Sequence, residues 1–251
     1  MSQAFFTDPL GSWPSDLQNI LLECDNFPAS LNSYIDIYKE EFVLKSMLKP
    51  NSGEVDKERL GREVDMMLLA GNDCAIPVIG RYFHGGVVTG FITRFGKCIT
   101  LGDRSDIHPE CHERRLEVIQ QFCALLDRLH SKGIMHGDVK PSNLVLDAHG
   151  NLRFIDFAEA MLESEPPGRR ASTTHYLSPS YTPGSPLTRA DDLYAAGVTI
   201  WHIYTGRVPF EDIEEDDLDM LIIKEGLRPD LSVIDDEVVK ALILKYLDGG
   251  E

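Results

Sequence analysis

The stretch IMHGDVKPSN, residues 134–143, is followed by LVL and, after a short loop, by LRFIDFA at residues 152–158. It carries three groups that suit catalysis: Asp138, Asn143 five positions later, and Asp156 thirteen positions beyond Asn143. Lys140 lies between the first two. A loop of this composition can offer a carboxylate base, a cation and an amide oxygen to one small volume.

The apolar runs beside this loop predict how Asp156 returns to it. Residues 144–146 and 152–155 favour two short strands, and the His149-Gly150-Asn151 sequence between them favours a turn. Such a hairpin would bring Asp156 back beside the loop. Oxygen ligands and a carboxylate base around a lysine suit Mg²⁺-dependent phosphoryl transfer, in which positioning and charge neutralisation provide most of the catalysis.

This stretch resembles the catalytic and magnesium loops of eukaryotic protein kinases, in which His-Arg-Asp-x-Lys-Pro-x-Asn precedes Asp-Phe-Gly. The Lys140-Pro141 pair is typical of serine/threonine kinases rather than tyrosine kinases. Two letters differ, because Gly137 replaces the family's arginine and Ala158 replaces its glycine. The alternative is a generic hairpin with chance polar residues, which the number of matched positions disfavours.

The resemblance implies a fold class and a domain organisation. The fold would be α+β and two-lobed, like that of protein kinases, with a small antiparallel-sheet N-lobe and a mainly helical, shortened C-lobe. We expect the N-lobe over residues 31–95 and the C-lobe over residues 96–251, as one kinase-like domain. Residues 1–30 contain several prolines and are expected to form an irregular lead-in.

The resemblance also implies ATP and Mg²⁺ as cofactors and a role for each polar group of the loop. Asp138 would orient the substrate hydroxyl and accept its proton. Lys140 would neutralise charge on the transferred phosphoryl group. Asn143 and Asp156 would hold Mg²⁺.

Two residues upstream complete the expected nucleotide site. Lys45 follows the apolar run Phe42-Val43-Leu44 and matches the strand lysine that holds the phosphates of the nucleotide in kinases. Glu63 comes eighteen positions later on a predicted helix and matches the glutamate that pairs with this lysine. The alternative for Lys45 is an ordinary surface lysine, and the alternative for Glu63 is one more exposed charge on the helix.

Hydrophobic periodicity predicts the other elements. Residues 55–70 carry Leu60, Val64 and Met67/Leu68 at helical spacing and end at Gly71, which predicts an amphipathic helix. Further helices and strands follow from the same kind of pattern. The expected helices span 110–131, 188–205 and 235–247, and the expected strands span 33–38, 41–44, 78–83 and 87–93.

The helix at 188–205 resembles the central helix of the kinase C-lobe. In the family, the aspartate at the position of Asp192 accepts hydrogen bonds from the backbone of the catalytic loop, so its expected role is structural. The alternative is a plain buried core helix. His136 is interpreted as a buried histidine that supports the loop, not as a catalytic group.

Several features depart from the family pattern. No glycine occurs between Gly11 and Gly53, so the glycine-rich loop that covers ATP phosphates in kinases is missing. Gly137 removes an arginine that pairs with a phosphorylated activation loop, which predicts less dependence on such a phosphate. Ala158 allows fewer backbone conformations after Asp156 than the family's glycine would. Ser180 replaces the glutamate of the family's Ala-Pro-Glu segment.

The leading hypothesis is ATP- and Mg²⁺-dependent phosphoryl transfer to serine or threonine hydroxyls of a protein substrate. A weak or inactive pseudokinase that acts as a binding module is the first alternative, although the sequence retains the catalytic groups. The second alternative is a small-molecule phosphotransferase of the aminoglycoside-kinase-like type, which His-Gly-Asp and Ile-Asp-Phe also resemble. Lys140-Pro141 and the helix at 188–205 favour the protein-kinase branch.

The composition is that of a soluble globular chain, with 43% hydrophobic and 26% charged residues among 251. The net charge of −17 argues against nucleic acid or an anionic membrane as partner, and no apolar stretch is long enough for a membrane span. The five cysteines form no CxxC pair and are expected to be reduced thiols. Because no signal-peptide pattern is present, we expect a cytoplasmic or nuclear protein. We also expect a monomer.

Overall fold

The computed structural model describes only part of the chain. The expected lead-in over residues 1–30 lies outside the described residues, as do residues 100–111 and 166–172. The chain divides into unit 1, residues 1–97 and 146–158, and unit 2, residues 98–145 and 159–251. The described residues are 33–38, 41–47, 54–84, 87–99, 112–165, 173–182 and 185–249.

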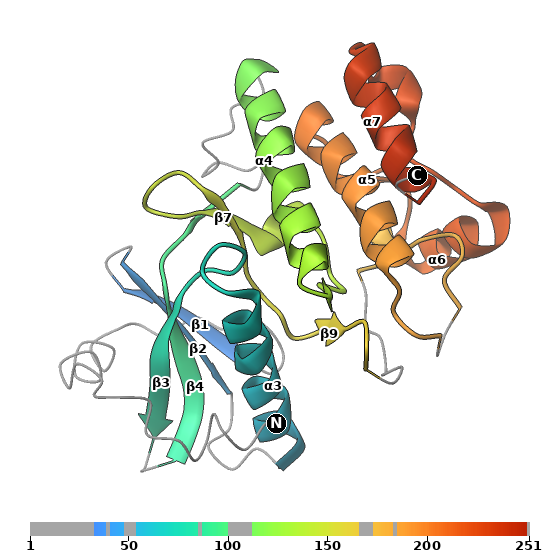
Figure 1. The fold of residues 1–251 in the computed structure, drawn as a ribbon. Coiled ribbons are helices and arrows are strands. Elements are labelled where there is room, and N and C mark those ends of the chain that lie inside the picture. Colours follow the sequence, from blue (N-terminus) through green and yellow to red (C-terminus); the bar gives the residue numbers. More distant parts are fainter. Residues whose placement is uncertain are drawn as a thin grey trace. The chain divides into compact units, whose positions relative to one another are not determined.

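Unit 1 is built on a four-stranded antiparallel sheet with the strand order β1-β2-β4-β3. Helix α3 packs beside β3 and β4 (Figure 1). Phe42, Leu44 and Ile92 form a buried cluster on this sheet. The strands are β1 (Ser33–Tyr38), β2 (Phe42–Met47), β3 (Val78–His84) and β4 (Val87–Arg94).

The predicted strands are all present; β3 and β4 each extend one residue further than expected, and β2 differs most. The run expected to stop before Lys45 continues to Met47, so Lys45 lies inside β2 and pairs with Phe91 of β4. Gly90 of β4 allows this close pairing, because a Cβ there would lie 2.5 Å from the Lys45 carbonyl oxygen. The sheet therefore fixes the backbone of Lys45 on both sides.

Helix α3 (Glu54–Ala70) confirms the helix predicted from the apolar spacing. Leu60, Val64 and Met67 are buried as expected, and Gly71 ends the helix with a φ of 73° while its N–H donates to the Met67 carbonyl at 3.0 Å. The placement of Leu68 on the buried face was wrong. Leu68 is 50% exposed, and Met66 lies in the core in its place.

The hairpin predicted around His149-Gly150-Asn151 is also present. β7 (Leu144–Leu146) and β8 (Leu152–Phe154) flank a turn in which Gly150 has a φ of 77° and donates to the Asp147 carbonyl. Within unit 1, Phe154 exchanges backbone hydrogen bonds with Cys74 and Ile76 after α3. These bonds fix the end of β8, from which Asp156 follows. β5 (Lys97–Cys98) and β7 each contain a boundary between the units.

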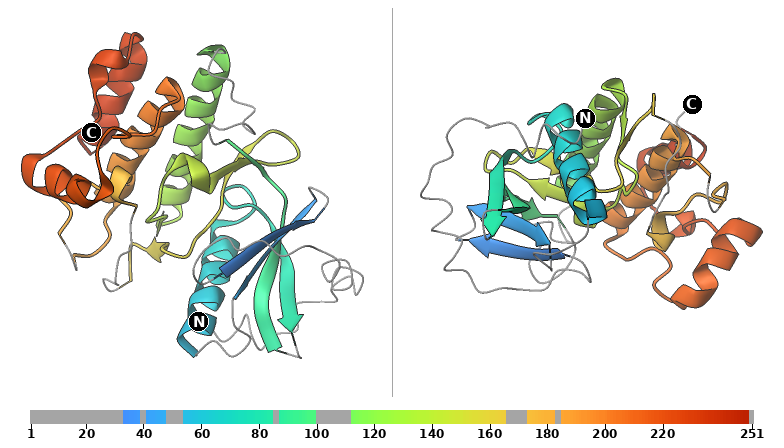
Figure 2. Two further views of the ribbon diagram at one scale, coloured as in Figure 1. Left: turned by 180° about the vertical axis from the view of Figure 1, so that it is seen from behind. Right: turned by 90° about the horizontal axis from the view of Figure 1, so that it is seen from below.

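Unit 2 is mainly helical. Helix α5 lies between α4 and α7, as Figure 1 and Figure 2 show from opposite sides. Gly197 permits the contact of α5 with α7, since a Cβ there would lie 2.9 Å from the side chain of Leu247. The helices are α4 (His112–Ser131), α5 (Arg189–Thr205), α6 (Glu215–Glu225) and α7 (Glu237–Leu247).

Three of these helices were predicted, and α6 was not. Its sequence begins with acidic residues that favour a solvated loop, but Leu218 and Ile222 pack against Leu177 and bury one face of the helix. Thr188 begins α5 with a capping box to Asp191, and Gly206 ends it in the left-handed conformation.

The predicted α+β class, with a small antiparallel sheet and a mainly helical part, is confirmed. Within the part of the chain that the structure describes, no helix has the length and apolar character needed to cross a membrane.

Candidate active site

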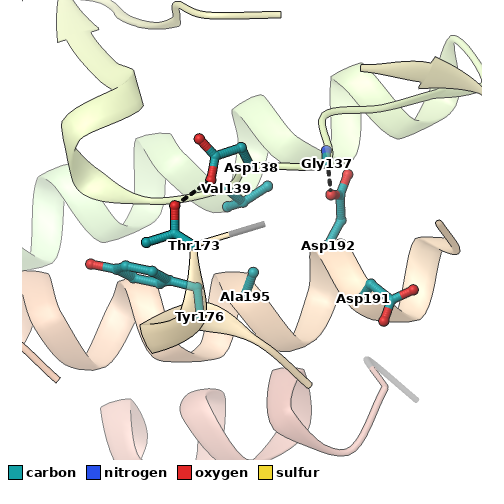
Figure 3. Close-up of a pocket in the computed structure, with 8 residues that line it drawn as sticks. All are labelled: Gly137, Asp138, Val139, Thr173, Tyr176, Asp191, Asp192 and Ala195. Atoms are coloured by element: carbon teal, nitrogen blue, oxygen red, sulfur yellow. Dashed lines mark hydrogen bonds between the residues drawn. The ribbon is translucent and has the colours of Figure 1, made fainter. Parts of the chain in front are cut away.

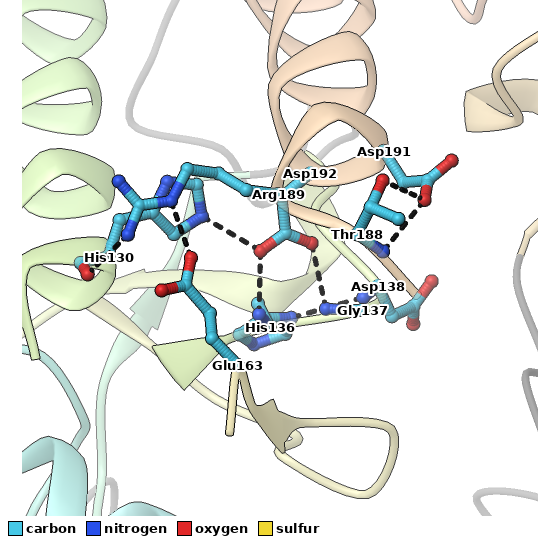
Figure 4. Close-up of polar contacts among 9 residues, drawn as sticks. All are labelled: His130, His136, Gly137, Asp138, Glu163, Thr188, Arg189, Asp191 and Asp192. Carbon is cyan, nitrogen blue, oxygen red and sulfur yellow. Dashed lines mark hydrogen bonds and ion pairs between the residues drawn. The ribbon is translucent and has the colours of Figure 1, made fainter. Parts of the chain in front are cut away.

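The backbone of the loop after β6 (Ile134–Met135) is held by a single carboxylate of α5. Asp192 accepts hydrogen bonds from the backbone N–H of His136 at 2.7 Å and of Gly137 at 2.9 Å (Figure 4). His130 Nε2 lies 3.0 Å from the same carboxylate, and Asp192 is only 2% exposed. The structural role predicted for Asp192 is therefore confirmed.

His136 is fully buried, and its Nδ1 accepts a hydrogen bond from the backbone N–H of Asp138 at 3.3 Å. This contact agrees with the interpretation of His136 as a support for the loop. Asp192 thus holds the two residues that precede Asp138, and the His136 ring holds the backbone N–H of Asp138 itself.

Gly137 allows two backbone segments to approach each other closely. It has a φ of 80°, and a Cβ at this position would lie 2.5 Å from the carbonyl oxygen of Glu159 and 3.0 Å from Leu187. A residue with a side chain would strain the backbone and displace the segment that contains Glu159. The sequence revealed only the loss of the family's arginine, and the structure adds a steric reason for glycine.

The Asp138 carboxylate accepts hydrogen bonds on both oxygens. Its Oδ1 accepts from the Thr173 hydroxyl at 2.8 Å, while its Oδ2 accepts from Asn143 Nδ2 at 2.8 Å and lies 2.7 Å from Lys140 Nζ. Lys140 Nζ also donates to the Thr173 hydroxyl at 2.7 Å. We call Asp138, Lys140, Asn143 and Thr173 the Asp138 network; Figure 3 shows the contact of Asp138 with Thr173.

Thr173 was missed by the sequence analysis. It lies in a polar segment whose residues show no periodicity. Its role becomes visible only in the folded chain, where its hydroxyl donates to Asp138. The 3₁₀ turn that follows, η2 (Thr174–Tyr176), is fixed to α5 by a 2.8 Å contact between the Tyr176 hydroxyl and His202 Nδ1. Burial lowers the pKa of His202 to about 4, so its neutral ring can accept this hydrogen bond at pH 7.

The loop, the segment from Thr173 to Tyr176 and α5 pack closely together. Figure 3 shows the residues around the cavity between them, whose volume is about 10 Å³, close to the space of one water molecule. The position of Asp138 is thus set by packing as well as by hydrogen bonds.

We expect replacement of Thr173 by valine to lower kcat by about 10- to 100-fold with little change in KM, because hydrogen bonds to charged groups contribute about 1.5–3 kcal/mol. Steady-state kinetics with peptide substrate and ATP would measure this. Thr173→Ser should retain most of the activity, and Thr182→Val at an exposed threonine is the matched control. Wild-type kcat in Thr173→Val would show that the hydroxyl does not position Asp138.

Asn143 is oriented by Asp138. It lies at the end of η1 (Pro141–Asn143), is 5% exposed, and its Nδ2 donates both to the Asp138 carboxylate and to the Asp138 carbonyl, each at 2.8 Å. Because these two hydrogen bonds fix Nδ2, the amide oxygen Oδ1 is the atom that can accept a hydrogen bond or bind a cation. A neutral oxygen of this kind fits a hard ion such as Mg²⁺.

In unit 1, Lys45 connects two carboxylates. Its Nζ donates to Glu63 Oε1 at 2.6 Å and to Asp156 Oδ1 at 2.9 Å. The Glu63 side chain is 4% exposed, whereas that of Asp156 is 44% exposed. Asp156 has a φ of 58°, an unusual conformation for a residue with a side chain and one that often marks functional positions.

The electrostatics of this cluster are dominated by burial. Burial raises the pKa of Glu63 to about 7, although the Lys45 ammonium opposes this shift. For Lys45, burial alone would lower the pKa, but the two neighbouring carboxylates together raise it above its ordinary value. Removal of Lys45 would therefore leave a buried carboxylate that takes up a proton.

We expect Lys45→Met to make stability more dependent on pH. A Glu63 pKa raised in the folded state means that the folded protein binds this proton more tightly, so the unfolding free energy falls as pH rises from about 4.5 through the folded pKa. Without the lysine that pKa rises further, and Lys45→Met should lose roughly 1 kcal/mol more than the wild type between pH 5 and 8. Urea titrations across this range would measure the loss.

The double variant Lys45→Met/Glu63→Gln is the control, because it lacks the titrating carboxylate and should not show the additional loss. Equal pH slopes for Lys45→Met and the double variant would contradict the assignment to Glu63.

Each of the six residues predicted to form the site belongs to one of two clusters. Unit 2 brings together Asp138, Lys140 and Asn143, and unit 1 brings together Lys45, Glu63 and Asp156. The metal site predicted for Asn143 and Asp156 combines one residue of each unit and stays a prediction.

The geometry described above agrees with the comparison to known families. The protein kinase domain family matches residues 33–241. The chain belongs to this family. The match begins with β1, ends within α7 and includes all six predicted site residues.

Individual relatives are serine/threonine kinases. The chain is 34% identical to the probable serine/threonine-protein kinase PknB of Lactococcus lactis over 107 residues, 41% of this chain and 17% of that protein. It is 28% identical to the serine/threonine-protein kinase PrkC of Bacillus subtilis over 138 residues, covering 53% and 19% of the two chains. Identity to the serine/threonine-protein kinase PknB of Mycobacterium tuberculosis is 31% over 150 residues, covering 53% and 24%.

The matched segments thus span less than a quarter of the length of these relatives. Membership of the kinase family applies to the domain of this chain. The activity, substrate and partners of the whole protein follow only as proposals.

Proposed function

We propose that this kinase-family chain transfers the terminal phosphoryl group of ATP to serine or threonine hydroxyls of a protein substrate. The observation that carries the proposal is the Asp138 network. A base must be fixed in position and close to a cation that neutralises the developing charge, and Asp138 and Lys140 combine both properties within 2.7 Å.

Asp138 acts on the substrate hydroxyl. Thr173 and Asn143 hold the carboxylate in one orientation, so that it can accept the hydroxyl proton as the oxygen attacks phosphorus. Lys140, which bonds both to Asp138 and to Thr173, provides positive charge for the phosphoryl oxygens.

Lys45 binds phosphate oxygens of ATP in this proposal, and Glu63 keeps its ammonium group in place. Asn143 and Asp156 are the residues that would hold Mg²⁺, since one presents an amide oxygen and the other a half-exposed carboxylate. Bound Mg²⁺ would supply neutralisation of the phosphate charges.

The preference for serine and threonine is supported by the Lys140-Pro141 pair and by the names of the relatives. The net charge of −17 favours basic substrate segments.

A second candidate function is that of a binding module with little or no turnover. The residues that join β1 to β2 include no glycine, and the backbone cannot approach phosphates as closely without it. This candidate predicts folded protein without phosphoryl transfer, whereas the first predicts turnover that depends on Lys45.

The test combines nucleotide binding with a panel of matched basic peptides that contain serine, threonine or tyrosine as the only hydroxyl. We expect ATP with Mg²⁺ to raise Tm, and phosphate to appear on the serine and threonine peptides alone. Lys45→Met should remove both effects, while Lys245→Met at an exposed lysine of α7 should not. Labelling of tyrosine alone, or none by folded protein, would overturn the proposal.

A further inference from the structure

A second pocket lies in unit 2, and none of its lining residues belongs to the Asp138 network. Its volume is about 380 Å³. The walls come from the segment after η2, from the first turns of α5 and from the end of α7, together with Arg228. The groups that matter for its chemistry are Ser178, Ser180, Tyr194 and Arg228.

The Tyr194 hydroxyl is buried in the wall of this pocket and has no hydrogen-bond partner among the described residues. Tyr194 is 4% exposed, and burial raises its pKa to about 12, so the hydroxyl is a proton donor at neutral pH. A buried donor without an acceptor is unfavourable, and structures usually satisfy it with a ligand, water or another group.

Arg228 adds a positive charge to the same pocket. Its Nη1 bonds to Asp248 Oδ1 at 2.7 Å, but the two side chains are 46% and 61% exposed. A pair as exposed as this contributes little to stability and can exchange partners at low cost. Arg228 is therefore available to a more highly charged anion.

Ser180 presents an exposed hydroxyl at the wall of the pocket. Its Oγ lies 2.7 Å from the Ser178 Oγ, and its backbone N–H donates to the same atom at 3.2 Å. Ser178 is 7% exposed, so this contact fixes Ser180 against a buried partner. Ser180 is thus exposed and lines the same pocket as the cation of Arg228.

We propose that Ser180 is a phosphorylation site and that its phosphate binds in this pocket to Arg228 and the Tyr194 hydroxyl. A free dianion would be repelled by the net charge of −17, whereas a phosphate attached to Ser180 is held beside Arg228 by its covalent bond. The bound phosphate would connect the segment after η2 to α5 and to the end of α7.

The modification uses ATP and a second copy of this chain, and in this respect it rests on the proposed function. A bond forms between Ser180 Oγ and the γ-phosphorus, and the bond from this phosphorus to the oxygen that bridges the β-phosphate breaks. ADP leaves with that oxygen. The hydroxyl proton of Ser180 passes to the Asp138 carboxylate of the copy that catalyses the transfer, and then to water.

The first experiment tests the binding pocket without any need for catalysis. Ser180→Glu places a carboxylate at the wall of the pocket and should raise Tm by about 2–4 °C. The increase should vanish in Ser180→Glu/Arg228→Gln and shrink in Ser180→Glu/Tyr194→Phe. Thr182→Glu, which adds the same charge at an exposed residue outside the pocket, should give no increase. An increase that persists without Arg228, or no increase at all, would overturn the proposed pocket.

The second experiment locates the phosphate by mass spectrometry after incubation with ATP and Mg²⁺. Phosphate on Ser180 of the Asp138→Asn variant, when it is mixed with wild-type protein but not when it is alone, is the expected result. If peptide substrates are phosphorylated but Ser180 is not, the proposed modification of Ser180 is overturned while the proposed function stands. If no substrate is phosphorylated, the proposed function fails together with self-modification, and the Tm comparison alone decides whether the pocket accepts an anion.

Discussion

The Asp138→Asn variant should lose between about 10²- and 10⁴-fold in kcat, because asparagine has nearly the same shape as aspartate but cannot accept the proton of the substrate hydroxyl. The hydrogen bonds from Asn143 and Lys140 to Oδ2 would also lose their charged acceptor. KM for ATP should change much less, since Lys45, which is proposed to bind phosphate oxygens of ATP, bonds to Glu63 and Asp156 rather than to Asp138. Initial rates at saturating ATP and Mg²⁺ would measure the effect.

The matched control is Asp212→Asn, whose side chain is 90% exposed, and it should keep wild-type rates. Equal Tm values for the wild type and Asp138→Asn would show that the loss concerns chemistry rather than folding. If Asp138→Asn kept kcat within tenfold of the wild type, Asp138 would not be the base, and the proposed reaction would need another.

The second large effect is expected at Asp192. Replacement by alanine leaves the backbone N–H groups of His136 and Gly137 without their acceptor and removes the partner of the buried His130. Each buried donor left without its acceptor costs about 1–3 kcal/mol of unfolding free energy. Urea denaturation should show this loss, and activity should fall with it because Asp138 directly follows Gly137.

Two controls separate the hydrogen bonds of Asp192 from its charge. Asp192→Asn keeps one acceptor and should have intermediate stability, while Asp219→Ala at an exposed acidic residue of α6 should be nearly neutral. If the unfolding free energy of Asp192→Ala lay within about 1 kcal/mol of the wild-type value, the role of this carboxylate in holding the loop would be contradicted.

Features with a local cause could be predicted from the sequence. The helix α3 follows from apolar spacing and from Gly71, and the turn between β7 and β8 follows from His149-Gly150-Asn151. The groups of the catalytic loop could be named because their order along the chain is that of a known family. The contacts of Lys45 with Glu63 and of Asp192 with the loop were expected on the same ground.

Features that arise from tertiary contacts could not be predicted. Thr173 meets Asp138 only because the Tyr176–His202 contact fixes η2 on α5, and no local pattern encodes that meeting. The steric need for Gly137 depends on the carbonyl of Glu159, which lies far along the chain. Helix α6 was missed because its first residues are acidic and favour a solvated face, although Leu218 and Ile222 pack against Leu177.

The central claim is that the Asp138 network catalyses phosphoryl transfer. The most direct test follows the terminal phosphoryl group of labelled ATP into a generic basic protein, with purified chain, in the presence and absence of Mg²⁺. We predict incorporation that requires Mg²⁺ and is lost in Asp138→Asn. Folded protein that gives no Mg²⁺-dependent incorporation, or a label that Asp138→Asn transfers as fast as the wild type, would contradict the account.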